Sequence, residues 1–302
     1  MHGRGWYQVA FESELTREVT PAAVGARRLL LLRMPEGLRI TDATCPHRGA
    51  DLGHGGRLDN GAIVCPFHGF HIGIGKPGAH GLHVRDYPSL VIGGLVFARP
   101  CDGHDNGFAS MMEELGRQRI IVPGFTLKLR AAAEMVIENA FDQAHFRSVH
   151  GIGLHGGFRL RPSETGELAV EGSFELPSSP WQRGRPGTEG SVVPFTARAF
   201  SPGLVVSHLG GKYPYGVITA ATPTPEGGCI IRLSLALEPD RTNRAPPREL
   251  IDFLLRRSRD GLDRDRLIWE HRSGAAPVHY TPLDGPVRAF HDFCAGFAEA
   301  AR

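Results

Sequence analysis

Two short motifs, Cys45-Pro46-His47 and Cys65-Pro66-Phe67-His68, decide how this sequence is interpreted. Each motif supplies one thiolate and one imidazole, and seventeen residues separate His47 from Cys65. Two cysteines and two histidines suit a [2Fe–2S] centre in which the cysteines bind one iron and the histidines bind the other. Neutral imidazoles in place of two thiolates make the cluster less negative, which raises its reduction potential. The motifs therefore predict a carrier of single electrons.

The bulk composition excludes several classes of function. A net charge of +2 and a pI of about 8.4 are too mild to predict nucleic-acid binding. The most apolar runs, at residues 29–32 and 90–98, are too short to cross a bilayer as helices. The five cysteines lack the spacing of a disulfide framework, and the first ten residues contain no apolar stretch. We therefore expect a cytoplasmic protein with no nucleic-acid or membrane partner.

Turn residues divide the chain into two parts. Residues 6–100 alternate between short strand-like runs and turns, and both cysteine motifs fall in the turns. The polar, turn-rich stretch at 100–107 predicts a boundary, giving domains at 1–102 and 103–302. Beyond it we expect a helix at 131–149, strands between 168 and 237, a long helix to about 272 and a last helix at 287–300. Strands followed by packed helices predict an α+β second domain.

The predicted helix near residue 140 carries a second set of metal-binding side chains. Asp142 and His145 are three residues apart and therefore share a helical face. His150 lies five residues after His145, so the helix must distort or end before His150 if both histidines bind one metal. Gly151 and Gly153 follow at once and make a helix end there plausible.

A third ligand is expected on the long C-terminal helix. Two histidines and one carboxylate with open positions form the ligand set of non-haem Fe(II) oxygenases. Asp265 shares the apolar face of this helix with Leu254 and Trp269, where a carboxylate makes sense beside a metal. Asp263 shares the polar face with Arg259 and is expected in solvent. Asp265 is thus the candidate ligand, although an ion pair with an arginine is the alternative.

With these residues in place, the chain resembles the α subunit of a Rieske non-haem iron oxygenase. The resemblance covers nearly the whole chain in the order of the family. It rests on three motifs: Cys45-x-His47 with Cys65-x-x-His68, Asn139-x-x-Asp142-x-x-His145-x-x-x-x-His150, and Asp265-x-x-Ile268-Trp269. The segments at 268–272 and 283–287 resemble those of the 3-ketosteroid 9α-hydroxylase oxygenase and related sterol-oxidising enzymes.

The resemblance implies a fold and a set of cofactors. It implies an N-terminal Rieske [2Fe–2S] β-domain and a C-terminal catalytic domain of helix-grip (START-like) form with an antiparallel sheet. The cluster would be held by Cys45, His47, Cys65 and His68, and the catalytic Fe(II) by His145, His150 and Asp265. Asn139 would lie near the iron without binding it.

The resemblance also implies how electrons travel. The family forms rings, most simply homotrimers, in which His68 of one subunit hydrogen-bonds Asp142 of the next and that Asp142 hydrogen-bonds His145. The chain lacks an NAD(P)H or flavin fingerprint, so a separate NAD(P)H-dependent reductase would supply electrons, directly or through a ferredoxin. With O2, the enzyme would act as a monooxygenase or dioxygenase that hydroxylates a small hydrophobic substrate, whether steroid-like, polycyclic or aromatic.

Other interpretations of the motifs remain open. Desaturation, demethylation or oxidative cyclisation would use the same ligands, and a Rieske electron carrier would lack the catalytic iron. Respiratory Rieske proteins carry additional cysteines at the equivalents of Ala50 and Phe67 and a serine at the equivalent of Phe70, which are absent here. Fewer hydrogen bonds would then reach the cluster sulfurs, which predicts a potential of about −150 mV. Zinc is disfavoured, because zinc sites usually pair like ligands with like.

Overall fold

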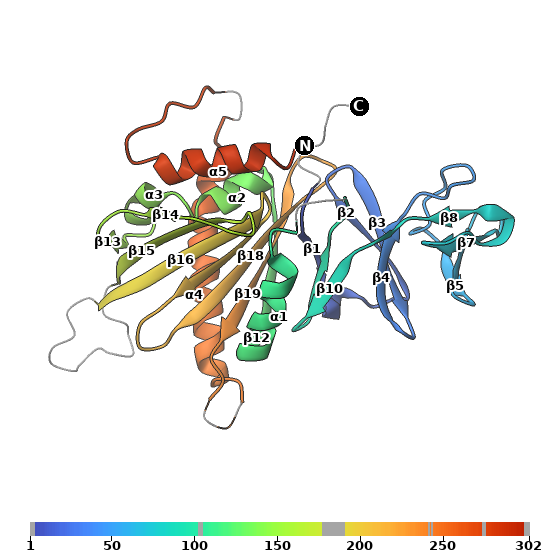
Figure 1. The fold of residues 1–302 in the computed structure, drawn as a ribbon, viewed down its shortest axis with the longest axis horizontal. Helices are drawn as coiled ribbons and strands as arrows, with labels where there is room; N and C mark the ends of the chain where they lie inside the picture. Colours follow the sequence, from blue (N-terminus) through green and yellow to red (C-terminus); the bar gives the residue numbers. More distant parts are fainter. Residues whose placement is uncertain are drawn as a thin grey trace.

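Short strands, antiparallel except for the pair β7 and β8, build the N-terminal part of the chain (Figure 1). The computed structural model describes residues 4–101, 105–176, 191–240, 242, 244–273 and 276–298. One sheet joins, in this order, β2 (Val19–Val24), β3 (Arg27–Met34), β4 (Gly37–Asp42) and β9 (Asp86–Tyr87). Another joins β5 (Arg57–Asp59), β6 (Ala62–Val64), β7 (His71–Ile74) and β8 (His83–Val84). Cys45 and Cys65 lie in the apolar core of this region with Leu30 and Ile63.

A third small sheet connects this region to the rest of the molecule. It has the order β1 (Tyr7–Phe11), β11 (Leu95–Ala98) and β10 (Ser89–Ile92). Trp6, just before β1, and Leu95 of β11 share one buried core with Phe108 and Phe200 of the C-terminal part. Because the two parts share a core, they form a continuous packed unit. The predicted domain boundary, after residue 102, lies outside the described residues and stays a prediction.

An antiparallel sheet dominates the C-terminal part, as predicted. Within the described residues, its order is β12 (Ile120–Leu129), β19 (Cys229–Leu237), β18 (Tyr215–Pro223), β17 (Leu204–Leu209), β16 (Ser191–Ser201), β15 (Leu168–Leu176) and β13 (Gly153–Leu154), with β14 (Arg159–Arg161) also paired to β15. Phe174 and Phe195 on its inner face are buried with Trp269 and Phe290 from the helices and with Phe141, which lies between two helices. The arrangement confirms the predicted α+β class.

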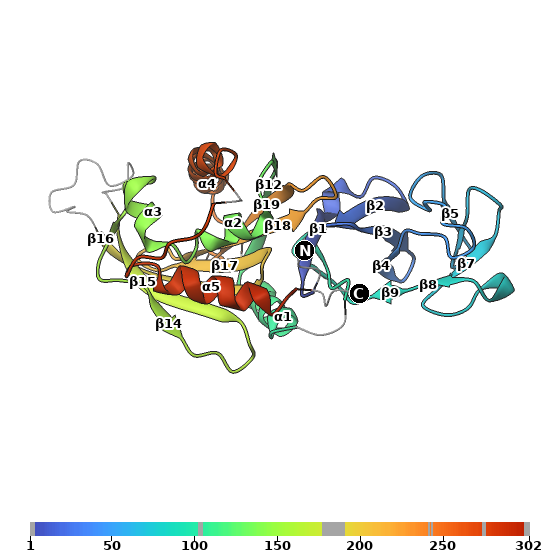
Figure 2. The same ribbon diagram turned by 90° about the horizontal axis from the view of Figure 1, so that it is seen from above.

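Helices flank this sheet. They are α1 (Phe108–Gln118), α2 (Ala133–Glu138), α3 (Gln143–Ser148), α4 (Arg248–Trp269) and α5 (Gly285–Ala295). Figure 2 shows α4 end-on and α5 lengthwise, so the two helices cross, and α2 packs against α5. None of the helices among the described residues combines the length and apolarity needed to cross a bilayer.

The prediction of one continuous helix at 131–149 is wrong, because this segment forms two short helices. Residues 139–142 separate α2 from α3. The Glu138 carbonyl accepts hydrogen bonds from the backbone N–H groups of Phe141 and Asp142, at 2.8 and 3.1 Å, which closes a turn. Asp142 then caps α3 with its carboxylate. Asparagine and aspartate compete with the backbone in this way and favour helix ends over helix interiors.

Candidate metal centres

The two cysteine motifs fold into matching loops. In the first loop, the Cys45 N–H donates to the Ala50 carbonyl at 2.8 Å, and the Gly49 N–H donates to the Cys45 carbonyl at 2.9 Å. The second loop repeats both bonds at 2.9 Å, with Cys65, Phe70 and Gly69 in the corresponding positions. Gly49 and Gly69 have φ of 74° and 70°, a region that favours glycine. The shared spacing Cys-Pro-x-x-Gly is the sequence signal for these two glycines, and it extends beyond the metal-ligand motifs themselves.

The two loops place their cysteines together in the protein interior and their histidines together at the surface. Cys45 and Cys65 are each 2% exposed, and burial raises the pKa of the Cys45 thiol, as does the neighbouring Cys65 thiol. The His47 and His68 rings are exposed, with their centroids 4.8 Å apart. Paired thiols inside and paired imidazoles outside fit the cluster in which cysteines bind one iron and histidines the other. Phe67, 61% exposed, packs against the His68 ring.

The second candidate centre joins α3, the residues after it, and α4. The ligand atoms of His145, His150 and Asp265 all lie within 4.8 Å of one another. His150 Nε2 is 3.3 Å from Asp265 Oδ1, and Asp265 is only 6% exposed. Burial lowers the pKa of His145, which keeps the imidazole neutral and able to bind a metal. The donor set and its burial fit a mononuclear Fe(II).

The local backbone explains why His150 reaches this cluster. The helix α3 ends at Ser148, before His150, as the spacing of the two histidines requires. The Ile152 N–H then donates to the Phe146 carbonyl at 2.9 Å, which turns the chain back. The His145 and His150 rings consequently lie 5.1 Å apart.

The helical faces of α4 separate the two aspartates as expected. Asp265 is buried, whereas Asp263 is half-exposed and accepts from Arg259 Nε at 3.0 Å. The ligand role of Asp265 stays a prediction, but its burial beside His150 is what that role requires.

Asp142 and Asn139 occupy the break between α2 and α3. Asp142 Oδ1 accepts from the backbone N–H groups of Ala144 and His145 at 2.9 and 3.2 Å. His145 Nδ1 lies 2.6 Å from the Asp142 backbone carbonyl, so the main chain, and not the expected carboxylate, orients this imidazole. A hydrogen bond to Nδ1 leaves Nε2 free to act as a ligand. Asn139 is the half-buried C-cap residue of α2.

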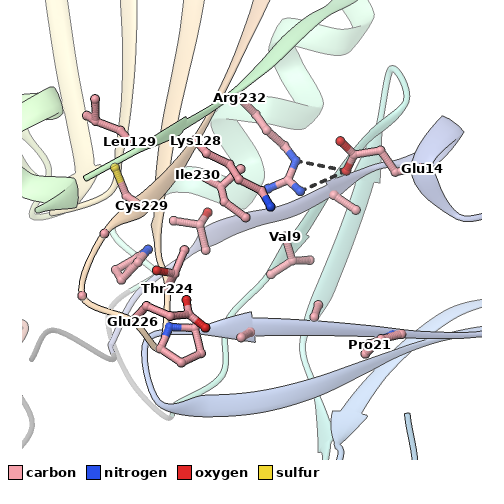
Figure 3. A pocket seen from close by; sticks show the side chains of 18 of the residues that line it. Val9, Glu14, Pro21, Lys128, Leu129, Thr224, Glu226, Cys229, Ile230 and Arg232 are labelled. Atoms are coloured by element: carbon pink, nitrogen blue, oxygen red, sulfur yellow. Dashed lines mark hydrogen bonds and ion pairs between the residues drawn. The ribbon is translucent and has the colours of Figure 1, made fainter. Parts of the chain in front are cut away.

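The cavity of about 860 Å³ in Figure 3 lies elsewhere, between the two parts of the chain. Val9 and Pro21 line one side, and Lys128 and Ile230 the other. Its walls include Arg266, the neighbour of Asp265, but not the three candidate ligands. It is therefore a gap at the junction and not the space above the candidate iron site.

Comparisons with known proteins match a different domain to each part of the chain. Residues 5–81 match the Rieske [2Fe-2S] domain, and residues 109–294 match the 3-ketosteroid 9alpha-hydroxylase C-terminal domain. Cholesterol 7-desaturase of Xenopus laevis is 32% identical over 178 residues, which are 53% of this chain and 39% of that protein. The oxygenase component of chloroacetanilide N-alkylformylase from Rhizorhabdus wittichii is 31% identical over 168 residues, 49% of this chain and 47% of that protein.

A solved structure extends the comparison to nearly the whole fold. Dicamba monooxygenase bound to 3,6-dichlorosalicylic acid superposes with a TM-score of 0.72 at 17% identity, covering 98% of this chain and 97% of that one. The alignments with the two curated relatives span less than half of each relative's length. The match to the C-terminal domain alone covers more than half of this chain. The chain therefore belongs to the Rieske non-haem iron oxygenases, in the family of the 3-ketosteroid 9α-hydroxylase C-terminal domain, whose cofactors are a [2Fe–2S] cluster and iron.

Proposed function

We propose that this chain is the oxygenase component of a Rieske monooxygenase or dioxygenase, oxidising a small hydrophobic substrate with O2. The observation that carries the proposal is the buried convergence of His145, His150 and Asp265 in a chain that also holds the cysteine–histidine quartet. When bound, the cluster at the quartet supplies single electrons, and the iron at the three ligands supplies a site for O2 reduction.

An apolar wall beside the candidate ligands supports a hydrophobic substrate. The Phe146 ring lies 4.2 Å from that of His145 and 4.6 Å from that of Phe174. Phe174 in turn lies 4.6 Å from Phe195, and both are almost fully buried. These side chains exclude water from one side of the site, and the half-buried Phe146 offers aromatic and aliphatic groups a ring to pack against. A steroid-like, polycyclic or aromatic molecule fits this chemistry.

The shape of the chain supports electron transfer between subunits. The strands β5, β7 and β8 around the cluster loops lie at one end of the long axis, and α3 lies at the other (Figure 1). Phe67 and His68 are exposed at the first end, and Leu267 and Ile268, 69% and 51% exposed, mark the end of α4. Exposed apolar side chains at two different surfaces suit a head-to-tail contact that closes as a ring, here a homotrimer. His68 of one subunit would then meet Asp142 of the next.

The remaining partners follow from what the sequence lacks. Without a dinucleotide or flavin fingerprint, the chain draws electrons from a separate NAD(P)H-dependent reductase, directly or through a ferredoxin. We place this system in the cytoplasm.

A second candidate function has specific support. The curated relatives include a desaturase and an N-alkylformylase, and dicamba O-demethylase from Stenotrophomonas maltophilia is 31% identical over 109 residues. Desaturation or demethylation needs the same ligands as hydroxylation, so the protein geometry accommodates each.

Metal content and product analysis test the proposal together. The purified chain should contain about three Fe per chain, whereas a Rieske electron carrier without catalytic iron would contain two. With a surrogate reductase, it should convert a member of a panel of steroids, aromatic acids and polyketides into an O2-dependent product, and mass spectrometry would distinguish added oxygen from lost hydrogen or methyl. Two Fe per chain with no such product would refute the oxygenase assignment.

A further inference from the structure

We infer that residues 280–291, called the strap here, hold the break between α2 and α3, and that Glu138 and Gln143 are the positioning residues through which they do so. The inference deepens the proposed function, because the break carries Asn139 and Asp142 and leads directly into His145. Three separate contacts join the strap to the break.

The first contact is a buried ionic one at Glu138. The Glu138 side chain is 12% exposed. Its Oε1 accepts from Arg272 Nη1 at 3.0 Å, and its Oε2 lies 2.6 Å from His291 Nε2. A buried carboxylate is tolerated when its oxygens are paired in this way. The backbone carbonyl of the same residue closes the turn by accepting from Phe141 and Asp142. Glu138 therefore links the strap to the backbone of Asp142 with no residue between.

The second contact is a two-sided hydrogen bond at Gln143, on the other side of the break. Its Nε2 donates to the Leu283 carbonyl at 2.9 Å, and its Oε1 accepts from the Phe158 N–H at 2.9 Å. An amide side chain can donate through its nitrogen and accept through its oxygen at the same time. Gly157 lets the loop come this close, since a Cβ there would lie 3.1 Å from Gln143 Oε1. Gln143 thus ties the start of α3 to the strap and to the loop before β14.

The third contact is apolar. Phe141 in the break and Phe290 in the strap are both fully buried, and their rings stack with centroids 5.2 Å apart. The strap is also closed on itself, because the Tyr280 hydroxyl lies 2.6 Å from His291 Nδ1. It can therefore act as one body when it holds the break.

These contacts matter because they hold the chain on both sides of the break. Its residues sit between two short helices, and the Asp142 carboxylate is occupied in capping α3. The strap fixes residues 138, 141 and 143, and the path between them sets where Asp142 points and where α3 begins. Since His145 is two residues beyond Gln143, the strap also sets one corner of the metal site.

Four variants of the full chain test the inference, with the cluster loaded and the mononuclear metal removed by a chelator. Glu138→Gln replaces one of the two carboxylate oxygens that pair with Arg272 and His291. Gln143→Glu removes the N–H group that donates to the Leu283 carbonyl. His291→Ala should reproduce Glu138→Gln without altering the break itself, whereas His291→Gln, which can still donate to Glu138, should restore wild-type behaviour. Asp263→Asn is the control, because it breaks an exposed pair on α4 close to Asp265.

Hydrogen exchange and Co(II) binding are the two measurements. In Glu138→Gln, His291→Ala and Gln143→Glu, amides at 139–150 should exchange at least about tenfold faster, while those of β12 and β19 stay unchanged. The affinity of the site for Co(II) should fall about 10–100-fold, with an altered visible spectrum, as for supports of metal ligands elsewhere. Asp263→Asn should change neither quantity.

Two results would overturn the inference. One is amide hydrogen exchange that, in the three disruptive variants, rises evenly over the whole catalytic part or does not rise at 139–150. The strap would then contribute only general packing. The other is a wild-type Co(II) affinity and spectrum in all three disruptive variants. A wild-type chain that takes up no Co(II) would instead refute the metal site of the proposed function, and the exchange data would still decide on the strap.

Discussion

Most core substitutions lower the stability of a protein, but replacing Asp265 by asparagine should raise it when the metal is absent. Asp265 is 6% exposed, and the partner of its carboxylate among the described residues is His150, at 3.3 Å. Burying a carboxylate without a cation is costly, and the isosteric amide removes that charge at constant volume. We expect the metal-free Asp265→Asn protein to be more stable than the metal-free wild type by about 1–2 kcal/mol.

With metal bound, the wild type should instead be more stable than Asp265→Asn. A ligand present at a thousand times its Kd stabilises the folded protein by about 4.1 kcal/mol. Loss of one of three protein ligands should weaken the site at least about 100-fold, as disruption of ligand supports alone costs 10–100-fold. At the same metal concentration, the variant would then gain only about 1.4 kcal/mol. The metal effect should therefore be about 2.7 kcal/mol larger in the wild type, or roughly 5–10 °C in Tm.

Thermal unfolding with and without Co(II), followed by circular dichroism, measures both differences. Asp263→Asn is a matched control on the same helix, since its exposed pair with Arg259 is worth at most about 1 kcal/mol with or without metal. If Asp265→Asn were less stable than the wild type without metal, or gained as much from Co(II), Asp265 would be a structural residue and not a ligand.

Three further substitutions or measurements follow from the geometry. Asp142→Asn should leave both metal sites filled and α3 intact, because asparagine caps a helix as well as aspartate, yet abolish coupled turnover; unchanged product per NADH would contradict the bridging role. The cluster midpoint, measured by potentiometric titration, should lie near −150 mV because Phe67 and Phe70 bring no hydrogen bonds to it, and a value above roughly 0 mV would refute this reasoning. Arg232→Met should lower the free energy of unfolding in urea by about 1–3 kcal/mol, because a buried guanidinium that binds Glu14 is lost; an unchanged midpoint would show that this pair does not support the junction.

The spacing of residues along helices was the most informative sequence signal for the mononuclear site. The period of 3.6 residues places Asp265 and Asp263 on different faces of α4 whatever the rest of the fold does. The same argument required α3 to end before His150, and it ends at Ser148. These predictions succeed because each depends on contacts within one element.

Predictions failed where distant residues decide the local structure. The break after Glu138 contains neither glycine nor proline, so its sequence favours a continuous helix over 131–149. The turn is held in part by Arg272 and His291, which are 134 and 153 residues away along the chain. No periodicity in the sequence identifies such partners. The backbone carbonyl that orients His145 is equally invisible, because a main-chain acceptor leaves no side-chain signal.

The junction between the two parts is the strongest reason to expect electrons to cross between chains. Backbone carbonyls at Trp6 and Gln8 accept hydrogen bonds from Ser201 and Thr222 at 2.8 and 2.6 Å, and these groups are buried. Swinging the cluster lobe toward its own iron site would expose this core and break these bonds, each worth about 1 kcal/mol. The cluster loops are thus held at the end of the molecule opposite α3 (Figure 1). A variant that stays monomeric should therefore accept an electron at its cluster and fail to use it, until a second chain brings His68 to Asp142.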